Sequence, residues 1–342
     1  PIWTEYEASR GLIMPVAFFA IMESALRHEQ GLDVEAHRDE LARLYAGFSR
    51  IARDNPHAWD RRSVEAHEIR NAKGKNRMLS FPYTKLHNSQ WNVDQASALI
   101  LCSVAKAEEL GVPRDRWVFP LAATQSCHVV PLTERRELFG SVGAALAGKA
   151  ALDLAETRAE QVAHVELYSC FPAAVRIFAR ELEFDLARPL TVTGGMPFAG
   201  GPLNNFVLQG TARMAEVLRE DPGQIGLVSS LSGIIGKQGF GVWSTEPNPR
   251  GYQFADVTAQ AVTEERRCEV EEGYQGPATL AGYTVSYAKD DPVSALAICD
   301  LPDGKRTLAS SSQADLLGRL MAVECCGRRV LVEQGGVFTL QD

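Results

Sequence analysis

Apolar residues recur at helical spacing through the first part of the chain. Residues 12–29 carry this spacing, and Asp33 stands where the N-cap of a second helix belongs. That helix is expected to reach about Ala52, because Asp54-Asn55-Pro56 follows and the residue before a proline disfavours the helical conformation. Residues 1–75 are therefore predicted to form a charged, helical region.

From Ser97 the pattern changes to short apolar runs that alternate with helical segments. Residues 98–102 and 117–123 are apolar enough for buried strands, and a short helix is expected between them at 106–110. Further helices are expected at 134–150, 156–162, 173–182 and 204–218, and further strands at 165–168, 225–231 and 240–245. The pattern predicts a layered α/β fold for residues 76–250.

The last part of the chain is richer in strand patterns and turns. Strands are expected at 278–287, 294–300, 306–309, 321–325 and 328–333, with one short helix at 314–319. We interpret residues 265–342 as a separate small β-rich domain, of the oligonucleotide-binding barrel type. This region has no stripe of basic and aromatic residues, which disfavours nucleic-acid binding.

Composition narrows the class of protein. The chain has 342 residues, 45% hydrophobic and 23% charged, and no apolar run approaches the roughly 20 residues of a membrane span. A formal net charge of −8 argues against a nucleic-acid-binding body. Seven cysteines show neither C-x-x-C pairing nor metal-ligand spacing with the seven histidines. These features predict a cytoplasmic protein with reduced cysteines and no metal site.

Two loops look like parts of one site. Tyr168-Ser169-Cys170 follows a predicted buried strand, and one helix later the chain carries Gly194, Gly195, Gly200 and Gly201 with two prolines. Such a glycine run must turn sharply or approach a ligand closely, and loops after buried strands are common ligand sites. A core tyrosine and a buried small cysteine are equally open interpretations of Tyr168 and Cys170.

A run of basic residues is the third candidate for part of a ligand-binding site. Arg70, Lys73 and Arg77 belong to it, and they form either a solvated loop or a clamp for a polyanionic cofactor. Near a third loop, at residues 230–241, Lys237 and Gln238 are the polar side chains able to point into a site.

These loops resemble those of the thiolase superfamily, most closely the sterol-carrier-protein thiolases and the actinobacterial thiolase-like proteins known as acetyl-CoA acetyltransferases. Tyr168-Ser169-Cys170-Phe171 lies where that branch has His-Asp-Cys-Phe. Residues 194–203 lie where it has Gly-Gly-x-x-x-x-Gly-His-Pro-x, and residues 230–241 lie where its last catalytic loop falls. The resemblance covers about residues 1–250.

The resemblance implies a thiolase-like layered αβα fold with four parts. They are a helical cofactor-binding loop region (1–75), the end of the N-terminal thiolase half (76–132), the C-terminal half (133–262) and an added barrel-like domain (265–342). In this family a nucleophilic cysteine takes the acyl group from a coenzyme A thioester, and a second cysteine serves as acid and base. The nucleophile belongs to an N-terminal half that is absent from this sequence.

Site roles follow from the resemblance and the motifs together. The expected catalytic residues are Cys170 and Tyr168, acting on acyl-coenzyme A as substrate, with no covalently bound cofactor and no metal. The residues expected to bind coenzyme A are Arg70, Lys73, Arg77, Gly194, Gly195, Gly200, Gly201, Asn204 and Lys237.

Two departures from the family pattern bear on activity. Tyr168 and Gly201 stand where the family has its two catalytic histidines. Losing one oxyanion-hole donor typically costs a factor of about 10²–10³ in turnover. A phenol with an ordinary pKa of about 10 can donate a hydrogen bond but is a poor base at pH 7. At Gly201 the missing side chain is expected to widen the pocket for a bulkier acyl chain.

Three functions remain open on this basis. The first is an acyltransferase on acyl-coenzyme A thioesters in lipid or sterol metabolism, with degenerate catalytic histidines. The second is a non-catalytic protein that binds coenzyme A or a lipid thioester. The third is a retro-aldol lyase on a β-hydroxyacyl-coenzyme A that uses Tyr168, with the β-rich tail as a tethered analogue of a partner protein. A homodimer, or a complex with the absent N-terminal fragment, is also left open.

Overall fold

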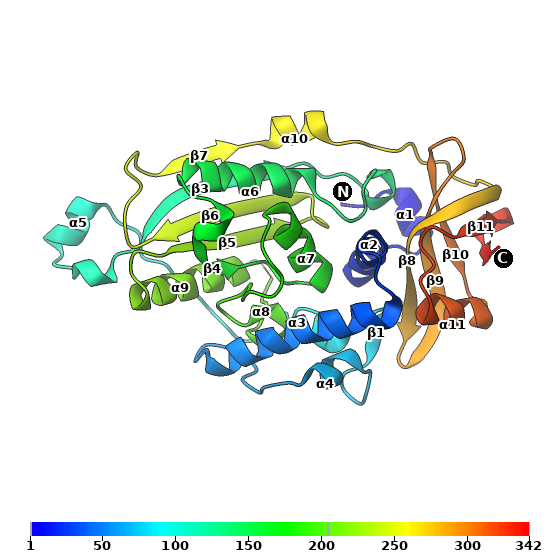
Figure 1. Ribbon diagram of the computed structural model, residues 1–342, viewed down its shortest axis with the longest axis horizontal. Helices are drawn as coiled ribbons and strands as arrows, with labels where there is room; N and C mark the ends of the chain where they lie inside the picture. Colours follow the sequence, from blue (N-terminus) through cyan, green and yellow to red (C-terminus); the bar gives the residue numbers. More distant parts are fainter. Residues whose placement is uncertain (1, 204, 342) are drawn as a thin grey trace.

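Two β-sheets stand at opposite ends of an elongated molecule, with helices between and around them (Figure 1). The computed structural model describes residues 2–203 and 205–341. Within these residues no helix has the length and apolar character needed to cross a membrane.

The larger part of the core surrounds a five-stranded sheet in the order β4-β5-β6-β3-β7. Strands β5 and β6 form an antiparallel hairpin, β3 is antiparallel to β6, and the two outer pairs are parallel. The bounds are Phe119–Cys127 (β3), Val162–Glu166 (β4), Ile225–Ser232 (β5), Lys237–Ser244 (β6) and Gln253–Asp256 (β7).

Helices cover both faces of this sheet, as the two-residue period of a strand requires. Leu227, Phe240 and Val242 belong to the main core together with helices α6 (Val142–Leu154) and α7 (Pro172–Glu181). On the other face, Val228 packs with Met214 of helix α9 (Asn205–Glu220). The sheet is therefore the middle of three layers.

The second sheet is built mainly from the last quarter of the chain. Its order is β10-β9-β8-β1-β2, and β11 pairs with both β8 and β12. A parallel bridge between Ser310 and Val337 brings the end of β10 to the start of β12. The bounds are Met78–Ser80 (β1), Tyr83–Thr84 (β2), Gly276–Ala288 (β8), Asp291–Asp300 (β9), Arg306–Ser311 (β10), Arg329–Val332 (β11) and Phe338–Leu340 (β12), and α11 spans Ala314–Ala322.

Helix α2 (Pro15–Glu29) connects the two halves. It packs against β8 on one side and α7 on the other, and residues 17–27 are all buried. Its residues 15–22 are all apolar, which is the pattern of a helix enclosed on every side. The remaining helices are α1 (Glu5–Ser9), α3 (Val34–Asp54), α4 (Ala66–Arg70), α5 (Val104–Glu109), α8 (Gly195–Phe198) and α10 (Thr258–Glu264).

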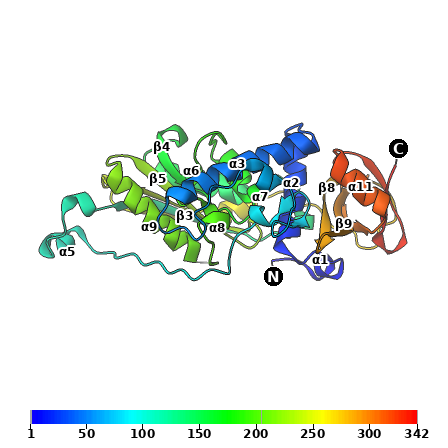
Figure 2. The same cartoon turned by 90° about the horizontal axis from the view of Figure 1, so that it is seen from below.

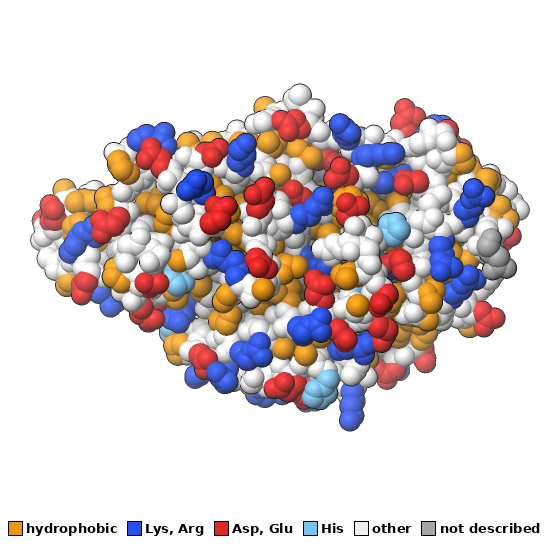
Figure 3. Space-filling model, viewed as in Figure 1, with side chains coloured by type: hydrophobic (Ala, Val, Ile, Leu, Met, Phe, Trp, Pro, Cys, Tyr) orange, Lys and Arg blue, Asp and Glu red, His pale blue; other side chains and the backbone are white. Residues whose placement is uncertain are grey.

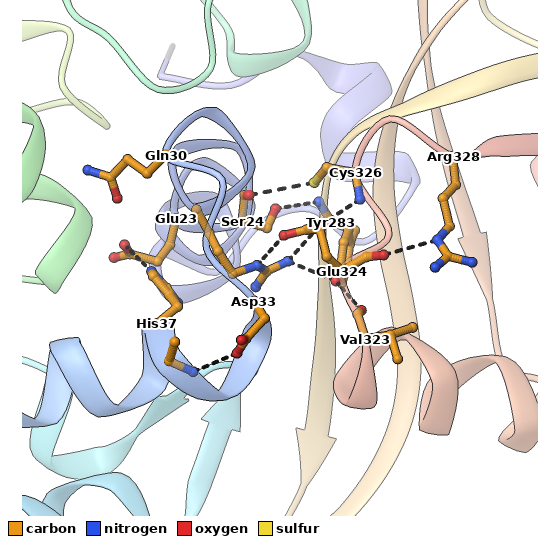
Figure 4. A network of polar contacts seen from close by, with 12 residues as sticks. Glu23, Ser24, Gln30, Asp33, His37, Tyr283, Val323, Glu324, Cys326 and Arg328 are labelled. Atoms are coloured by element: carbon orange, nitrogen blue, oxygen red, sulfur yellow. Dashed lines mark hydrogen bonds and ion pairs between the residues drawn. The ribbon is translucent and has the colours of Figure 1, made fainter.

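Two charged residues on α2 are buried and paired in different directions. Arg27 faces the C-terminal sheet, where it bonds Glu324 at 2.5 Å and the hydroxyl of Tyr283 at 2.8 Å (Figure 4). Glu23 faces α3 and the far edge of that sheet, where it contacts His37 of α3 and accepts a hydrogen bond from the hydroxyl of Tyr83 in β2. Both charges are matched, as burial in a low-dielectric core requires.

Several predicted elements are confirmed. The helix expected at 12–29 spans 15–29, and Asp33 caps α3 by accepting a hydrogen bond from the Ala36 N–H at 2.7 Å. The expected strands at 117–123, 225–231, 240–245, 278–287, 294–300, 306–309 and 328–333 lie within or overlap β3, β5, β6, β8, β9, β10 and β11. Helices expected at 106–110, 173–182, 204–218 and 314–319 overlap α5, α7, α9 and α11.

Three predictions of local structure are wrong. Residues 98–102, expected as a buried strand, belong to an extended stretch without strand pairing, and Ile100 is 97% exposed (Figure 2). Apolar character alone cannot form a strand that lacks a hydrogen-bonding neighbour. The segment 156–162 holds only a short 3₁₀ turn, because Glu156 adopts a positive φ. Residues 321–325 end α11 and enter a turn, not a strand.

The Arg27–Glu324 pair generates a stability prediction. Replacing Glu324 with Gln leaves the fully buried Arg27 guanidinium without its countercharge. Breaking a buried pair costs about 3–5 kcal/mol, and we expect about 2–3 kcal/mol here because Glu324 is partly exposed. Urea unfolding monitored by tryptophan fluorescence measures the change. The exposed Glu333→Gln is the control, and equal stabilities for the two variants would contradict the prediction.

Candidate active site

Three loops meet at one end of the five-stranded sheet. The Ser169 hydroxyl accepts a hydrogen bond from the Met196 N–H at 2.9 Å, which joins the loop after β4 to the glycine-rich loop. The Ser89 N–H donates to the Cys170 carbonyl at 3.1 Å, and the Gln90 N–H donates to the Met196 carbonyl at 3.1 Å. The two loops predicted to share a site are therefore in contact, and residues 89–90 tie them together.

Tyr168 stands at the edge of a hollow of about 540 Å³ over strands β3, β5 and β6. Its backbone N–H donates to the Ser229 hydroxyl at 2.8 Å, and its ring meets Phe206 edge to face, 5.7 Å between centroids. Burial raises the pKa of Tyr168 above its ordinary value. The phenol is therefore protonated at neutral pH and can donate a hydrogen bond to a ligand in the hollow.

Cys170 lies two residues further on, beside the same apolar cluster of Tyr168, Met196 and Phe206. Although the residue as a whole is partly exposed, its thiol is enclosed, and burial raises the pKa of Cys170 to about 12. A thiol in this state is a poor nucleophile at neutral pH, because the thiolate is the reactive form.

The glycine loop is shaped by close packing. A Cβ on Gly194, where φ is +101°, would lie 2.5 Å from the backbone nitrogen of Ala52, and a Cβ on Gly195 would lie 2.6 Å from the Phe48 ring. These two glycines let the loop approach α3 closely. The loop is thus fixed by the helix on which it rests.

The second pair of glycines packs against the segment after β2. A Cβ on Gly200 would meet the Gln95 side chain, and one on Gly201 would lie 2.8 Å from the Met196 Cβ and close to the Ser89 hydroxyl. The space beside Gly201 is therefore filled, and the expected widening of the pocket is wrong. Asn204, also predicted to bind coenzyme A, lies outside the described residues.

Glu166 anchors the glycine loop and was missed by sequence reasoning. Its buried carboxylate accepts hydrogen bonds from the N–H groups of Val192 and Thr193, both at 2.8 Å, and from the hydroxyls of Thr191 and Thr193. Burial without a cationic partner raises the pKa of Glu166 to about 7, although these hydrogen bonds act to lower it. The sequence feature that could have identified Glu166 is an acidic residue in an otherwise apolar predicted strand.

The loop after β4 is also linked to the buried charges on α2. The Tyr83 hydroxyl accepts a hydrogen bond from the Ala173 N–H at 3.1 Å and donates one to Glu23 at 2.5 Å. Since Ala173 is three residues beyond Cys170, this pair fixes the start of α7 and with it the position of the thiol.

The predicted cationic residues lie in two places. Lys237 is exposed at the start of β6, lines the same hollow as Tyr168, and pairs across the sheet with Cys127 and Ser232. Arg70 lies on α4 and forms ion pairs with Glu35 and Asp39. Lys73 and Arg77 are exposed on the segment between α4 and β1. Arg70, Lys73 and Arg77 do not line the hollow, so the basic run and the loops are not brought together there.

No cluster of three or more histidine, cysteine or acidic side chains in residues 2–203 and 205–341 is arranged to hold a metal ion. The seven cysteines are all free.

Comparison with known proteins places this geometry in a family. The structure superposes on the crystal structure of a monomeric SCP2-thiolase-like protein type 1 from Mycobacterium smegmatis with a TM-score of 0.86 and 30% sequence identity. The match covers 99% of this chain and 75% of that one. The chain belongs to the SCP2-thiolase-like proteins of type 1. Its fold is thiolase-like, and residues 257–337 match the model of the thiolase-like protein type 1 additional C-terminal domain.

Two more distant structures were also found to be similar. The Ltp2–ChsH2(DUF35) aldolase matches 70% of this chain and 66% of its own with 19% identity and a TM-score of 0.56. The dimeric peroxisomal thiolase of Saccharomyces cerevisiae matches 70% of this chain and 61% of its own with 21% identity and a TM-score of 0.48.

The raised pKa of Glu166 predicts a pH-dependent contribution to stability. The folded state holds the proton up to about pH 7, whereas the unfolded state releases it near 4.5. The stabilisation is therefore complete below pH 4.5 and is lost as the pH rises through 7. Relative to Glu166→Gln, the free energy of unfolding should fall by roughly 3 kcal/mol over this window. Denaturant unfolding across pH measures it, with exposed Glu160→Gln as control, and a pH-independent difference contradicts it.

The packing of Gly194 predicts a large cost for a single methyl group. Gly194→Ala combines a positive φ with overlap against the Ala52 backbone, so we expect a loss of more than about 3 kcal/mol. Gly251→Ala is the matched control, because Gly251 also has a positive φ but no atom within 4 Å of the added carbon. The control should lose about 1 kcal/mol. Similar thermal unfolding midpoints for both variants would show that the loop does not rest rigidly on α3.

Proposed function

We propose that this chain acts on acyl-coenzyme A thioesters as an acyltransferase of the thiolase superfamily, in lipid or sterol metabolism. The observation that carries the proposal is that two proton-bearing groups, Tyr168 and Cys170, share one apolar cluster, from which Tyr168 reaches the hollow. They stand in a chain whose fold is thiolase-like. Coenzyme A is then part of the substrate and not a resident cofactor.

Tyr168 acts in this proposal as the donor to the thioester oxygen. Its protonated phenol donates a hydrogen bond to the carbonyl oxygen, where negative charge develops during acyl transfer. The apolar contacts of its ring with Met196 and Phe206 hold the phenol at the edge of the hollow. This role replaces the imidazole donor that the thiolase motif has at the same position.

Cys170 acts as a proton-transfer group. With a pKa of about 12 its thiol is almost wholly protonated at neutral pH. In the proposed transfer the thiol of a second coenzyme A attacks the β-carbonyl carbon of the acyl group, the bond between the α and β carbons breaks, and Cys170 gives its proton to the α-carbanion so formed. The proton of the attacking thiol then returns to Cys170. Cys170 stands at the start of α7, two residues before Pro172, so the helix N-terminus stabilises the transient thiolate left behind.

The phosphates of coenzyme A are assigned to the predicted clamp of Arg70, Lys73 and Arg77. Lys73 and Arg77 are exposed and have no ion pair within residues 2–203 and 205–341, so both are available to a polyanion. Arg70 is already paired with Glu35 and Asp39 and contributes less. Lys237 is assigned to the acyl end of the ligand, because it lines the hollow beside Tyr168.

A second candidate is retro-aldol cleavage of a β-hydroxyacyl-coenzyme A. It is favoured by the protonated state of both Tyr168 and Cys170, because this reaction needs proton transfer and carbonyl polarisation but no nucleophilic thiolate. The strand order β10-β9-β8-β11-β12, with the Ser310–Val337 bridge and α11 between β10 and β11, supports an oligonucleotide-binding-type barrel at the C-terminus. Such a barrel is the tethered partner that this alternative calls for.

We also propose a cellular compartment and an oligomeric state for this chain. Seven free cysteines support a reducing compartment, which we take to be the cytoplasm. The related protein from Mycobacterium smegmatis is described as monomeric, and a monomer is the simplest assembly for this chain. A homodimer, or a complex with a separate N-terminal thiolase segment, remains the alternative assembly.

The proposal predicts separate effects of two substitutions. Tyr168→Phe removes the hydroxyl alone and should lower kcat by about 10²–10³ with KM within a few-fold. Cys170→Ala should abolish turnover while acyl-coenzyme A affinity stays within a few-fold. Coenzyme A release and product mass from acetoacetyl- and β-hydroxyacyl-coenzyme A measure both, and the product identifies acyl transfer or cleavage.

The exposed Tyr252→Phe is the matched control and should leave turnover unchanged. Wild-type kcat in both site variants would contradict the catalytic roles. Tight binding of acyl-coenzyme A without any turnover by the native protein would instead assign the chain as a thioester-binding protein.

A further inference from the structure

A groove of about 630 Å³ lies between α3 and the turn after α7, away from the Tyr168 hollow. Leu44, Phe48 and Ile51 form its floor from one face of α3, and Arg43, Arg50 and Arg188 stand around it. We call this feature the arginine groove. Figure 3 shows basic and hydrophobic side chains next to one another on the face of the molecule where α3 and α7 lie.

Two of its arginines have no countercharge. Arg43 and Arg50 are exposed, and neither forms an ion pair in the described part of the chain. They are seven residues apart on α3, which places them on one side of the helix roughly 10 Å apart. In a chain of net charge −8, an uncompensated pair of guanidinium groups beside an apolar surface is a local site for an anion.

The carboxylates of the groove are already occupied. Asp54 accepts two hydrogen bonds from Arg53, both at 2.9 Å, and Glu40 pairs with Arg176 at 3.3 Å. The positive charge of Arg43 and Arg50 is therefore not cancelled from within the groove.

Arg176 adds a fixed cation to the wall of the groove. Its side chain is only 1% exposed and is held by Glu23, Glu40 and Gln30, yet its Nε and Nη1 have no hydrogen-bond partner among the described residues. A buried donor without a partner is costly, so a site that leaves one beside a groove gains from a bound acceptor.

The chemistry of the lining selects the kind of ligand. Every polar side chain that lines the groove is charged, and no amide, hydroxyl or imidazole is present among its described residues. A nucleotide base needs neutral donors and acceptors to be recognised along its edge, and the groove offers none from side chains. An apolar floor with cations at the rim fits a molecule that has one anionic group and an otherwise apolar body.

We propose that the arginine groove binds a single-chain anionic lipid. Its acyl chain lies on Leu44, Phe48 and Ile51, and its carboxylate or phosphate is held by the rim arginines. This assignment does not depend on the thioester chemistry at Tyr168. Phe48 connects the two sites, because its ring also packs against Gly195 of the glycine loop.

Isothermal titration calorimetry of the full chain with dodecanoate and with dodecyl phosphate, both below micelle formation, tests the proposal. We expect saturable one-to-one binding of at least one of them, which also distinguishes a carboxylate from a phosphate head. Hexanoate should bind at least tenfold more weakly, because each buried methylene contributes roughly a two- to fourfold gain. Adenosine 3′,5′-bisphosphate, the nucleotide portion of coenzyme A, should not compete.

The double variant Arg43→Gln/Arg50→Gln should weaken binding of the dodecyl ligand at least tenfold. Both side chains are exposed, so the variant keeps its fold, which its thermal unfolding midpoint verifies. Arg266→Gln is the control, because Arg266 is exposed and does not line the groove, and it should bind within twofold of the native protein.

Three results would overturn the proposal. They are no binding of either dodecyl ligand, equal binding by the native protein and the double variant, and competition by the nucleotide that the double variant abolishes. The last result would assign the groove to a nucleotide instead of a lipid.

Discussion

Burial of two opposite charges on a single helix is the constraint on which the structure depends. Helix α2 lies between the two sheets, and it carries Glu23 and Arg27 where no water can solvate them. Arg27 is neutralised by Glu324 in the turn between α11 and β11, and Glu23 is enclosed by His37 of α3, Arg176 of α7 and Tyr83 of β2. Burial acts to raise the pKa of Glu23, but Arg176, His37 and Tyr83 together hold it below its ordinary value. Both halves of the molecule thus supply partners to charges on α2, and a shift of either half would leave a buried charge without its partner.

The site inherits its geometry from this arrangement. Tyr83 bonds both Glu23 and the Ala173 N–H, and it thereby fixes the start of α7. Glu166 and the glycines fix the glycine-rich loop that lies opposite. The result is a rigid frame around two groups that remain protonated, Tyr168 and Cys170. Preorganised donors of this kind can stabilise developing negative charge without a nucleophile. Phe48 of α3 both supports the glycine loop and belongs to the floor of the arginine groove, so the two sites are neighbours.

Sequence patterns predicted most of the fold because the decisive signals were local. The Asp33 cap, the helical spacing before Glu29 and the short apolar strands each depend on neighbours within a few residues. The strand predicted at residues 98–102 is absent for the opposite reason. Their apolar run fits a strand, but a strand also needs a paired neighbour, and pairing depends on the whole fold.

The site was only partly predictable for a similar reason. Tyr168, Cys170 and the glycines were found from motif and turn chemistry, and contact between their two loops followed the expectation. Ser89 and Glu166 were missed because their roles consist of hydrogen bonds to residues distant in the chain. The space at Gly201 was misjudged because a missing side chain leaves room only if no neighbour fills it, and here Ser89 and Met196 do.

We propose that this site works through protonated donors and not through an acyl-enzyme cysteine. Denaturing mass spectrometry of the protein after incubation with acetoacetyl-coenzyme A at neutral pH distinguishes the two. We expect a single unmodified species at the mass of the 37.4 kDa chain. An acyl adduct localised by peptide mapping to Cys170 would contradict it, because burial would then not hold that thiol in its unreactive, protonated form.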